Sequence, residues 1–171
     1  MEFAPAITLM PLESIIRPLE ATDLEQLVAI EQDAHEHPWK ESIHLSCIEQ
    51  EYPSLVLEIK GGVVAYVVFN YLYDECNLMN ITTTPKLQGR GYASQLMHSL
   101  YQHSKQAGMK SVLLEVRESN QPALSFYRKE GFEEIGRRSS YYPKDEQRED
   151  AVVMRRSLDE LPSTPTGLLV D

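Results

Sequence analysis

The stretch TPKLQGRGYASQL, residues 84–96, connects a predicted strand, NLMNITTTP (residues 77–85), to a predicted helix, ASQLMHSLYQHSKQAG (residues 93–108). Most helices begin at one small polar residue, but here Gly89 and Gly91 precede the helix. Glycines let N–H groups at the helix start, which lack acceptors within the helix, face a ligand directly. With the helix dipole, this predicts a phosphate cradle that has Arg90 at its rim. A glycine turn that only reverses the chain is the alternative.

Strands and helices are predicted around this stretch in the order β-α-α-β-β-β-α-β-α-β-β. SLVLEI (residues 54–59) and VVAYVVFNYL (residues 63–72) flank Lys60, Gly61 and Gly62, which indicates a β-hairpin. The strand before the glycine stretch continues through its helix to SVLLEVR (residues 111–117), which predicts a central βαβ unit. We therefore expect an α+β fold with a mixed, twisted β-sheet flanked by helices.

The first predicted helix follows a short strand within residues 15–34. Thr22 and Glu25 have the spacing of a capping box, which predicts the start of this helix. One face carries three apolar residues and one acidic residue, namely Leu24, Leu27, Val28 and Glu31. The pattern predicts that this face packs on the sheet.

Composition narrows the class of protein. The chain has 171 residues, which fits one domain at residues 1–158 and a flexible tail at residues 159–171. A net charge of −10 argues against nonspecific nucleic-acid binding. Cys47 and Cys76 lack metal-ligand spacing, so we expect buried thiols and no metal. Without a signal peptide or an apolar run long enough for a bilayer, a cytoplasmic monomer that does not bind membranes is expected.

The glycine stretch resembles the cofactor motif of a known enzyme family. Gln88-x-x-Gly91-x-Ala93 matches the Gln/Arg-x-x-Gly-x-Gly/Ala pattern of the GNAT acetyltransferases. EQDAHEHPW, NITTTPKLQGRGYA, LLEVRESNQPALSFYRKEGF, RRSSYYP and REDAVVM further resemble, in order, segments of the bacterial ribosomal-protein alanine N-acetyltransferases (the RimI family). The chain departs from that pattern at Ala93, at His37 and by one extra residue in RRSSYYP. The last two departures concern the side that would bind a peptide.

The resemblance implies that acetyl-CoA is the cosubstrate. The motif residues would bind its pyrophosphate, and they are Gln88, Gly89, Arg90, Gly91, Tyr92, Ala93 and Ser94. The resemblance also implies that the preceding strand splays from the next one, so that Ile81, Thr82 and Thr83 offer backbone groups to the pantetheine and the thioester oxygen. An ordinary strand is the alternative for these β-branched residues. Asn120 would bond the pantetheine arm, or would serve only as a turn residue before Pro122.

Two residues are candidates for the chemistry. Strand alternation places Leu113, Glu115 and Arg117 on one face, and a partly desolvated Glu115 would suit a general base. A surface ion pair with Arg117 is the alternative, and the resemblance favours a base that acts through a water. Tyr127 has an ordinary pKa of about 10, which suits a proton donor to the departing thiolate. Its alternative role is that of a core aromatic, and the resemblance favours a general acid.

The reaction expected from the resemblance is direct acetyl transfer in a ternary complex. The acceptor would be the N-terminal alanine of a ribosomal protein, the small-subunit protein bS18. Trp39, Tyr141 and Tyr142 are candidates to bracket the peptide N-terminus, although the loop that carries the tyrosines could instead cover a core edge. Acetylation of a lysine side chain or of a small amine is the alternative enzyme function. A non-catalytic module that binds acetyl-CoA is the alternative from another class.

Overall fold

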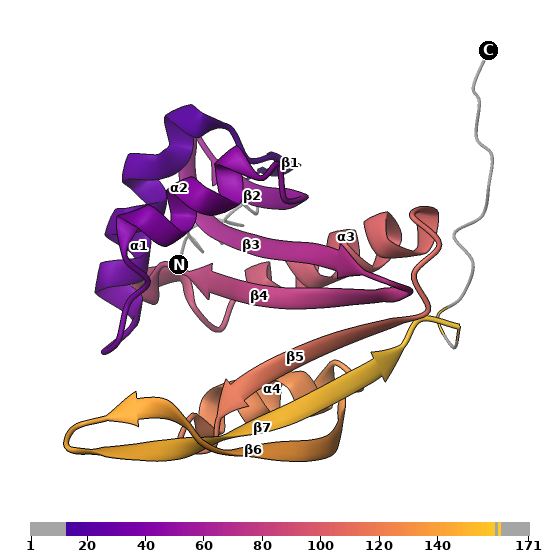
Figure 1. Cartoon of the computed structure of the whole chain (residues 1–171). Helices are drawn as coiled ribbons and strands as arrows, with labels where there is room; N and C mark the ends of the chain where they lie inside the picture. Colours follow the sequence, from indigo (N-terminus) through magenta and orange to yellow (C-terminus); the bar gives the residue numbers. More distant parts are fainter. Residues whose placement is uncertain (1–12, 160, 162–171) are drawn as a thin grey trace, which may run out of the picture.

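The computed structural model describes residues 13–159 and 161, and it contains one seven-stranded sheet with helices on both faces (Figure 1). The sequence predicts an irregular tail at residues 1–12, and these residues lie outside the described part of the chain. So does the predicted tail after residue 158, apart from Asp159 and Leu161. The elements are β1 (Ser14–Pro18), η1 (Ala21–Asp23), α1 (Leu24–Ala34), α2 (Glu41–Glu49), β2 (Ser54–Ile59), β3 (Gly62–Leu72), β4 (Glu75–Thr83), η2 (Pro85–Leu87), α3 (Tyr92–Gln106), β5 (Ser111–Arg117), α4 (Gln121–Lys129), β6 (Glu133–Lys144) and β7 (Gln147–Ser157).

The sheet order is β1-β2-β3-β4-β5-β7-β6, and this confirms the predicted α+β fold with a mixed sheet. β4 and β5 are parallel and are connected through α3, whereas the other neighbouring strands are antiparallel. Lys60 (φ 51°) and Gly61 (φ 82°) form the two-residue turn of the β2–β3 hairpin. Positive φ at both positions suits the twist of a tight hairpin. The last two strands, β6 and β7, form a long hairpin in which only residues 145 and 146 connect them.

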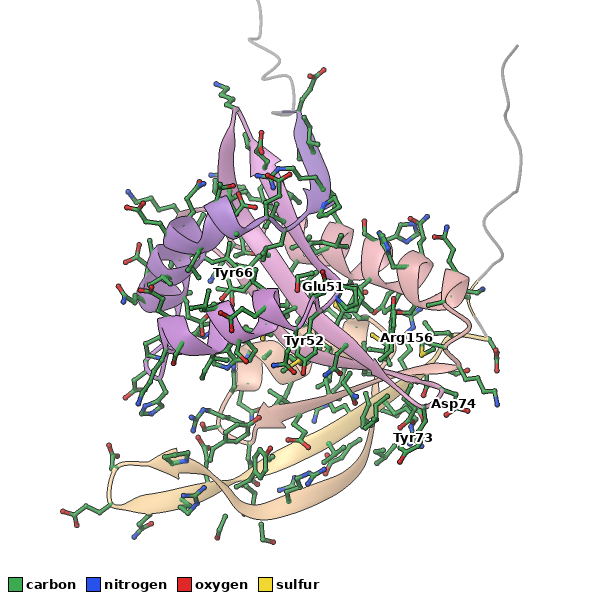
Figure 2. The ribbon with its side chains drawn as sticks, turned by 45° about the horizontal axis from the view of Figure 1, so that its top comes forward. Glu51, Tyr52, Tyr66, Tyr73, Asp74 and Arg156 are labelled. Carbon is green, nitrogen blue, oxygen red and sulfur yellow. The ribbon has the colours of Figure 1, made fainter. Side chains whose placement is uncertain are left out.

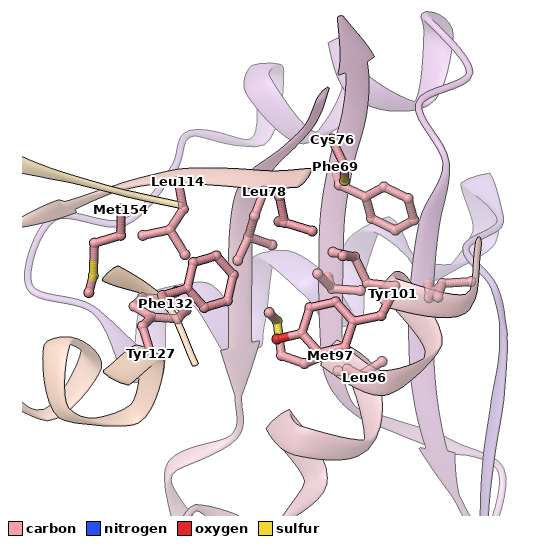
Figure 3. Close-up of a cluster of buried hydrophobic side chains, with 14 of the residues drawn as sticks. Phe69, Cys76, Leu78, Leu96, Met97, Tyr101, Leu114, Tyr127, Phe132 and Met154 are labelled. Atoms are coloured by element: carbon pink, nitrogen blue, oxygen red, sulfur yellow. The ribbon is translucent and has the colours of Figure 1, made fainter. Parts of the chain in front are cut away.

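The larger hydrophobic core lies between the sheet and helices α3 and α4 (Figure 3). The apolar face of α3 is buried, and it consists of Leu96, Met97, Leu100 and Tyr101. Alternate residues of β3 and β5, such as Phe69 and Leu114, contact these helices. Cys76 is buried in this core as a free thiol. The core therefore fixes the starts of α3 and α4 against the central strands.

A second core packs α1 and α2 on the opposite face of β2 and β3. Leu27 and Ile30 of α1 and the free thiol of Cys47 in α2 pack against Val56, Val68 and Tyr66 of the sheet (Figure 2). Because helices cover both of its faces, β3 is apolar along almost its whole length. The predicted capping box of Thr22 and Glu25 is wrong. A short 3-10 turn precedes α1 instead, in which the Asp23 carboxylate accepts the Glu20 N–H at 2.9 Å.

β4 and β5 pair only over their first residues. The paired residues run from Glu75 with Ser111 to Leu78 with Leu114, and the strands then diverge (Figure 1). Lys110 closes the paired end, where its Nζ lies 3.1 Å from Asp74 Oδ2 at the β3–β4 turn (Figure 2). At the other end, Met79 is an extra residue in the β3–β4 pairing, since Val68 and Phe69 face Asn80 and Leu78. A β-bulge bends its strand, and this one lies where β4 leaves β5.

The described part of the chain has neither a membrane-spanning helix nor a metal cluster. Within residues 13–159 and 161, none of the helices is both long and apolar enough to cross a membrane. The same residues hold no group of three or more His, Cys, Asp or Glu side chains that could ligate a metal. Three cavities border the region where β4 and β5 diverge.

We expect a buried histidine to make the fold acid-sensitive. His44 is 1% exposed between Trp39 and Tyr66, and neither ring nitrogen has a hydrogen-bond partner among the residues described. Burial lowers its pKa, against the opposing attraction of Glu31. The ring therefore stays neutral in the folded state, while the unfolded chain binds a proton below about pH 6.5. This stability is present above pH 6.5 and is lost as the pH falls toward the lowered folded pKa.

Urea unfolding at several pH values would test this expectation. Between pH 7 and 5.5, the free energy of unfolding of the wild type should fall by about 1 kcal/mol more than that of His44→Leu. His98→Leu, at an exposed position of α3, is the matched control and should follow the wild-type pH dependence. Parallel curves for the wild type and His44→Leu would contradict the explanation.

Candidate active site

The divergence of β4 and β5 leaves two strand edges without partners. β3 pairs with the other edge of β4 as far as Thr83, and β7 pairs with the other edge of β5 as far as Arg117. Beyond Leu78 and Leu114, the facing edges of β4 and β5 form no ladder with each other. Some backbone groups on these edges have local partners, such as the Thr83 carbonyl oxygen, which accepts Gln88 Nε2 at 3.1 Å. The other N–H and C=O groups are available to an extended ligand that lies between the strands. Ile81 and Thr83 lie along this open edge of β4.

The glycine stretch places an uncapped helix start next to this opening. Gly89 (φ 75°) and Gly91 (φ 84°) both have left-handed backbone, and Gly91 is the N-cap residue of α3. No side chain caps the helix, and its first internal bond runs from the Gln95 N–H to the Gly91 carbonyl oxygen at 3.1 Å. A Cβ atom at either glycine would meet no atom within 4 Å. The N–H groups of the first helical turn therefore face open space, as an anion site requires.

A cavity of about 520 Å³ connects this helix start to the open strand edge. Most of the residues predicted to bind the cofactor line it: Ile81, Thr83, Gln88, Gly89, Gly91, Tyr92, Ala93 and Ser94. Thr83 Oγ1 is buried there without a hydrogen-bond partner in the described part of the chain. A cradle open at both glycines and an orphaned hydroxyl fit a ligand that carries phosphate at one end and polar groups along its length.

Three predicted cofactor residues lie away from this cavity. Arg90 is exposed on the glycine loop. Thr82 points to the opposite side of β4, where its hydroxyl contacts α1. Asn120 lines a neighbouring cavity, and its Oδ1 accepts the Ala123 N–H at 3.2 Å as the N-cap of α4. The capping role explains the residue type at Asn120, and it leaves the amide nitrogen free to bind a ligand.

Tyr127 lies where two cavities meet. It lines the 520 Å³ cavity and a larger one of about 790 Å³, which also contains Glu115 in its wall. The ring packs edge-on against Phe132, with 5.7 Å between ring centroids (Figure 3). Burial, with a smaller effect of Tyr142, raises the pKa of Tyr127 above its ordinary value. Its phenol therefore stays protonated at neutral pH.

Glu115 lies on the β5 side of the opening, on the face predicted by strand alternation. Its Oε1 forms an ion pair with Arg138 Nε at 2.6 Å, so the alternative role, an ion pair with Arg117, is not observed. Arg117 is 3.0 Å from Glu149 instead. A hydrogen bond to the Glu115 carboxylate raises the pKa of Tyr141. The carboxylate therefore carries an ion pair on one side and faces the cavities on the other.

Aromatic side chains line a third cavity on this face. The cavity of about 390 Å³ is lined by Trp39, Glu115, Tyr141 and Tyr142 among others. The two tyrosine rings meet at right angles with centroids 4.9 Å apart, and the Arg117 guanidinium lies 4.5 Å from the centre of the Tyr142 ring. The aromatic residues predicted to bracket a peptide are thus brought together next to Glu115.

The sequence interpretation missed a buried polar cluster on the β4 side. Glu31 is 2% exposed, and its Oε1 accepts the Trp39 N–H at 2.9 Å. Its Oε2 accepts the Tyr66 hydroxyl and Asn80 Nδ2. Burial, together with this carboxylate, raises the pKa of Tyr66. The available signal was the single acidic residue on the otherwise apolar face of the first predicted helix.

Comparison with known proteins identifies the family. Residues 18–132 match the model of the acetyltransferase (GNAT) family. The chain belongs to the GNAT acetyltransferases. The matched region of this GNAT chain includes the glycine loop and both candidate catalytic residues, Glu115 and Tyr127. GNAT enzymes use acetyl-CoA, which agrees with the open cradle before α3.

Individual relatives are similar over most of their length. A protein of Escherichia coli strain K12 named [ribosomal protein bS18]-alanine N-acetyltransferase is 36% identical over 139 residues, which are 81% of this chain and 94% of the relative. The protein of that name from Haemophilus influenzae is 39% identical over 142 residues, 82% of this chain and 97% of the relative. The crystal structure of the E. coli ribosomal-protein-S18-alanine N-acetyltransferase superposes with a TM-score of 0.80 at 32% identity, covering 91% of this chain and 100% of that one.

Proposed function

We propose that this protein transfers the acetyl group of acetyl-CoA to the α-amino group of the N-terminal alanine of ribosomal protein bS18. Its relatives of that name support the substrate, because the similarity spans nearly their whole length. One observation supports the proposed chemistry: Glu115 and Tyr127 line the same cavity, and the unpaired ends of β4 and β5 border that cavity. The protein would act as a monomer by direct transfer in a ternary complex, without an acetylated cysteine.

The cavity beneath the α3 start would hold acetyl-CoA. The N–H groups of Gly89, Gly91 and the first helical turn would bind the pyrophosphate. Gln88 would keep the loop in place, because its Nε2 donates to the Thr83 carbonyl oxygen at 3.1 Å. The open edge of β4 at Ile81 and Thr83 would bind the pantetheine, with help from Asn120. Acetyl-CoA supplies a thioester carbonyl that an uncharged amine can attack.

Glu115 would accept a proton from the amine, and Tyr127 would assist the departing sulfur. An α-amino group has a pKa of about 7.7–8.0, so a carboxylate acting through a water can remove its proton with modest assistance. Glu115 is suited to this role because part of its carboxylate faces the cavity. Tyr127 keeps its proton at neutral pH and would donate a hydrogen bond to the sulfur that departs.

The acceptor would enter from the side opposite the cofactor. Trp39, Tyr141 and Tyr142 would surround the first residues of the peptide beside Glu115. The net charge of −10 would attract the basic tail of a ribosomal protein over long range. This arrangement keeps the cofactor and the peptide on opposite sides of the sheet until they meet at the opening.

Thiol release from acetyl-CoA with a short peptide would test the acceptor. The peptide carries a free N-terminal alanine and one internal lysine, and the control peptide has a blocked N-terminus. We expect turnover only with the free terminus, because its amine is neutral at a far lower pH than that of lysine, whose pKa is about 10.4. Equal turnover of both peptides would indicate a lysine acetyltransferase. No turnover with either would favour a small-molecule enzyme or a non-catalytic module.

The glycine cradle can be tested with a matched pair of substitutions. Gly91 and Gly108 lie at opposite ends of α3, both have positive φ, and a Cβ atom added at either would meet no other atom within 4 Å. Gly91→Ala and Gly108→Ala should each lower the free energy of unfolding by about 1 kcal/mol, because a Cβ atom strains left-handed backbone. Only Gly91→Ala should also weaken acetyl-CoA binding, by about tenfold or more in Kd by calorimetry. Equal affinities for the two variants would place the pyrophosphate elsewhere.

We expect substitutions at the two candidate catalytic residues to reduce turnover while the protein remains folded. Glu115→Gln and Tyr127→Phe should each lower kcat by about 10²–10⁴ and change KM little, as expected for groups that transfer protons. Glu118→Gln, at an exposed site, is the control for the first variant. Tyr101→Phe, a buried tyrosine of the same core, is the control for the second. Wild-type kcat in Glu115→Gln would exclude Glu115 as the base.

A further inference from the structure

A histidine on the β4 side of the acceptor cavity is connected to the buried Glu31 carboxylate. His35 is the residue after α1, and it lines the 790 Å³ cavity together with Glu115 and Tyr127. Its Nε2 lies 2.9 Å from Thr82 Oγ1 and 3.7 Å from Glu31 Oε2. The imidazole side chain is 36% exposed, whereas that of Glu31 is 3% exposed. One end of the ring therefore meets a buried polar cluster, and the ring also borders the cavity.

The hydrogen-bond donors and acceptors of this cluster determine which tautomer His35 adopts. Asn80 Nδ2 donates to Glu31 Oε2 at 3.1 Å, so Asn80 Oδ1 is the atom that faces Thr82, at 3.0 Å from its hydroxyl. Thr82 has one hydrogen, and two acceptors, Asn80 Oδ1 and Glu31 Oε2, lie within 3.3 Å of its oxygen. A bare Nε2 on His35 would add a third acceptor around that single hydrogen. The cluster is satisfied when Nε2 carries a hydrogen and donates it to Thr82.

This tautomer leaves Nδ1 of His35 as a proton acceptor. Nδ1 has no hydrogen-bond partner within residues 13–159 and 161. A proton taken up there would make an imidazolium whose positive charge lies close to the Glu31 carboxylate. In hydrolases a buried carboxylate bonds a catalytic histidine directly and fixes its tautomer. Here the Thr82 hydroxyl, which lies between His35 and Glu31, does so.

Glu115, on the opposite wall, is already engaged. Its carboxylate is in contact with Arg138 Nε at 2.6 Å and with the Tyr141 hydroxyl. These two contacts occupy part of the carboxylate that would otherwise be open to the amine. A second acceptor on the β4 wall would relieve this limitation.

We propose that His35, held by Thr82 and Glu31, is a second proton acceptor for the amine substrate, across the cavity from Glu115. The inference rests on the proposed function, because it requires an amine acceptor. One N–H bond of the ammonium breaks and its proton moves to Nδ1, directly or through a water. The nitrogen electron pair then forms the C–N bond, and the C–S bond breaks with its electron pair on sulfur. A second N–H bond breaks as the amide forms, and that proton neutralises the thiolate. The imidazolium returns its proton to bulk water.

Other charged groups border the same cavity and also shape its pH response. They include Glu36 next to His35, and on the facing elements Glu115, Arg117, Lys144, Asp145 and Glu149. Besides Glu31, the remaining titratable groups in its wall are His37, Tyr127 and Tyr142. A test must therefore compare variants at each pH and not rely on one profile.

The pH dependence of kcat/KM for the alanine peptide separates proton transfer from a structural role. About one α-amino group in twenty is neutral at pH 6.5, and more than nine in ten are neutral at pH 9. His35→Gln keeps an N–H donor for Thr82 but removes the acceptor. We expect a loss of about tenfold at pH 6.5 and of less than twofold at pH 9. His103→Gln, at an exposed site of α3, is the matched control and should lose nothing at either pH.

Nitrogen NMR of the wild-type protein provides a readout that does not depend on turnover. Above neutral pH, His35 should show a protonated Nε2 and a bare Nδ1. A protonated Nδ1, or a loss in His35→Gln that is the same at every pH, would overturn this inference and leave the proposed function intact. A wild-type protein that binds acetyl-CoA but acetylates no amine would overturn the proposed function and this inference together.

Discussion

The arrangement of the molecule depends on where β4 stops pairing with β5. Four residue pairs join the two strands, and the bulge at Met79 then turns β4 away. A fully paired sheet would have no free backbone groups at its centre, and a ligand would have to compete with the ladder for them. The divergence instead exposes hydrogen-bonding groups inside a sheet whose other neighbouring strands remain paired. The cavities that contain Glu115, Tyr127 and His35 all border this single interruption.

The two hydrophobic cores explain why the opening holds its shape. α3 and α4 pack on one face through a core that includes Leu96, Leu100 and Tyr127, and they fix the helix start that faces the glycine loop. α1 and α2 pack on the other face, where Glu31 binds groups from β3, β4 and the loop before α2. A charge buried at this depth is tolerated because each carboxylate oxygen has donors. The same contacts hold β4 in its bent conformation. The polar cluster on one face of the sheet therefore helps to keep the gap between β4 and β5 open to both faces.

Local sequence patterns were sufficient for the fold and for the open glycine loop before α3. The apolar periodicity of α3, the turn at Lys60 and Gly61, and the glycines before α3 each act within a few residues, and the structure confirms the elements that they predict. The open cradle at Gly89 and Gly91 also follows from local backbone preference. The divergence of β4 from β5 was expected only from family resemblance, because a bulge such as that at Met79 depends on how β4 pairs with β3 and has no signal in its own residues.

The acceptor side could not be predicted in the same way, because its contacts join residues distant in sequence. Glu115 has Arg117 two residues away, yet its ion pair is with Arg138 of β6, a strand separated from β5 by β7. The register aligns Gly136 with Glu115 across β7, so the Arg138 side chain reaches the carboxylate diagonally. Glu31, His35 and Thr82 come from α1, its following loop and β4, and no spacing within one segment links them. What the sequence did contain was an acidic residue on an apolar helical face. A buried carboxylate must find donors, so that position alone is a reason to search for a polar cluster beneath the helix.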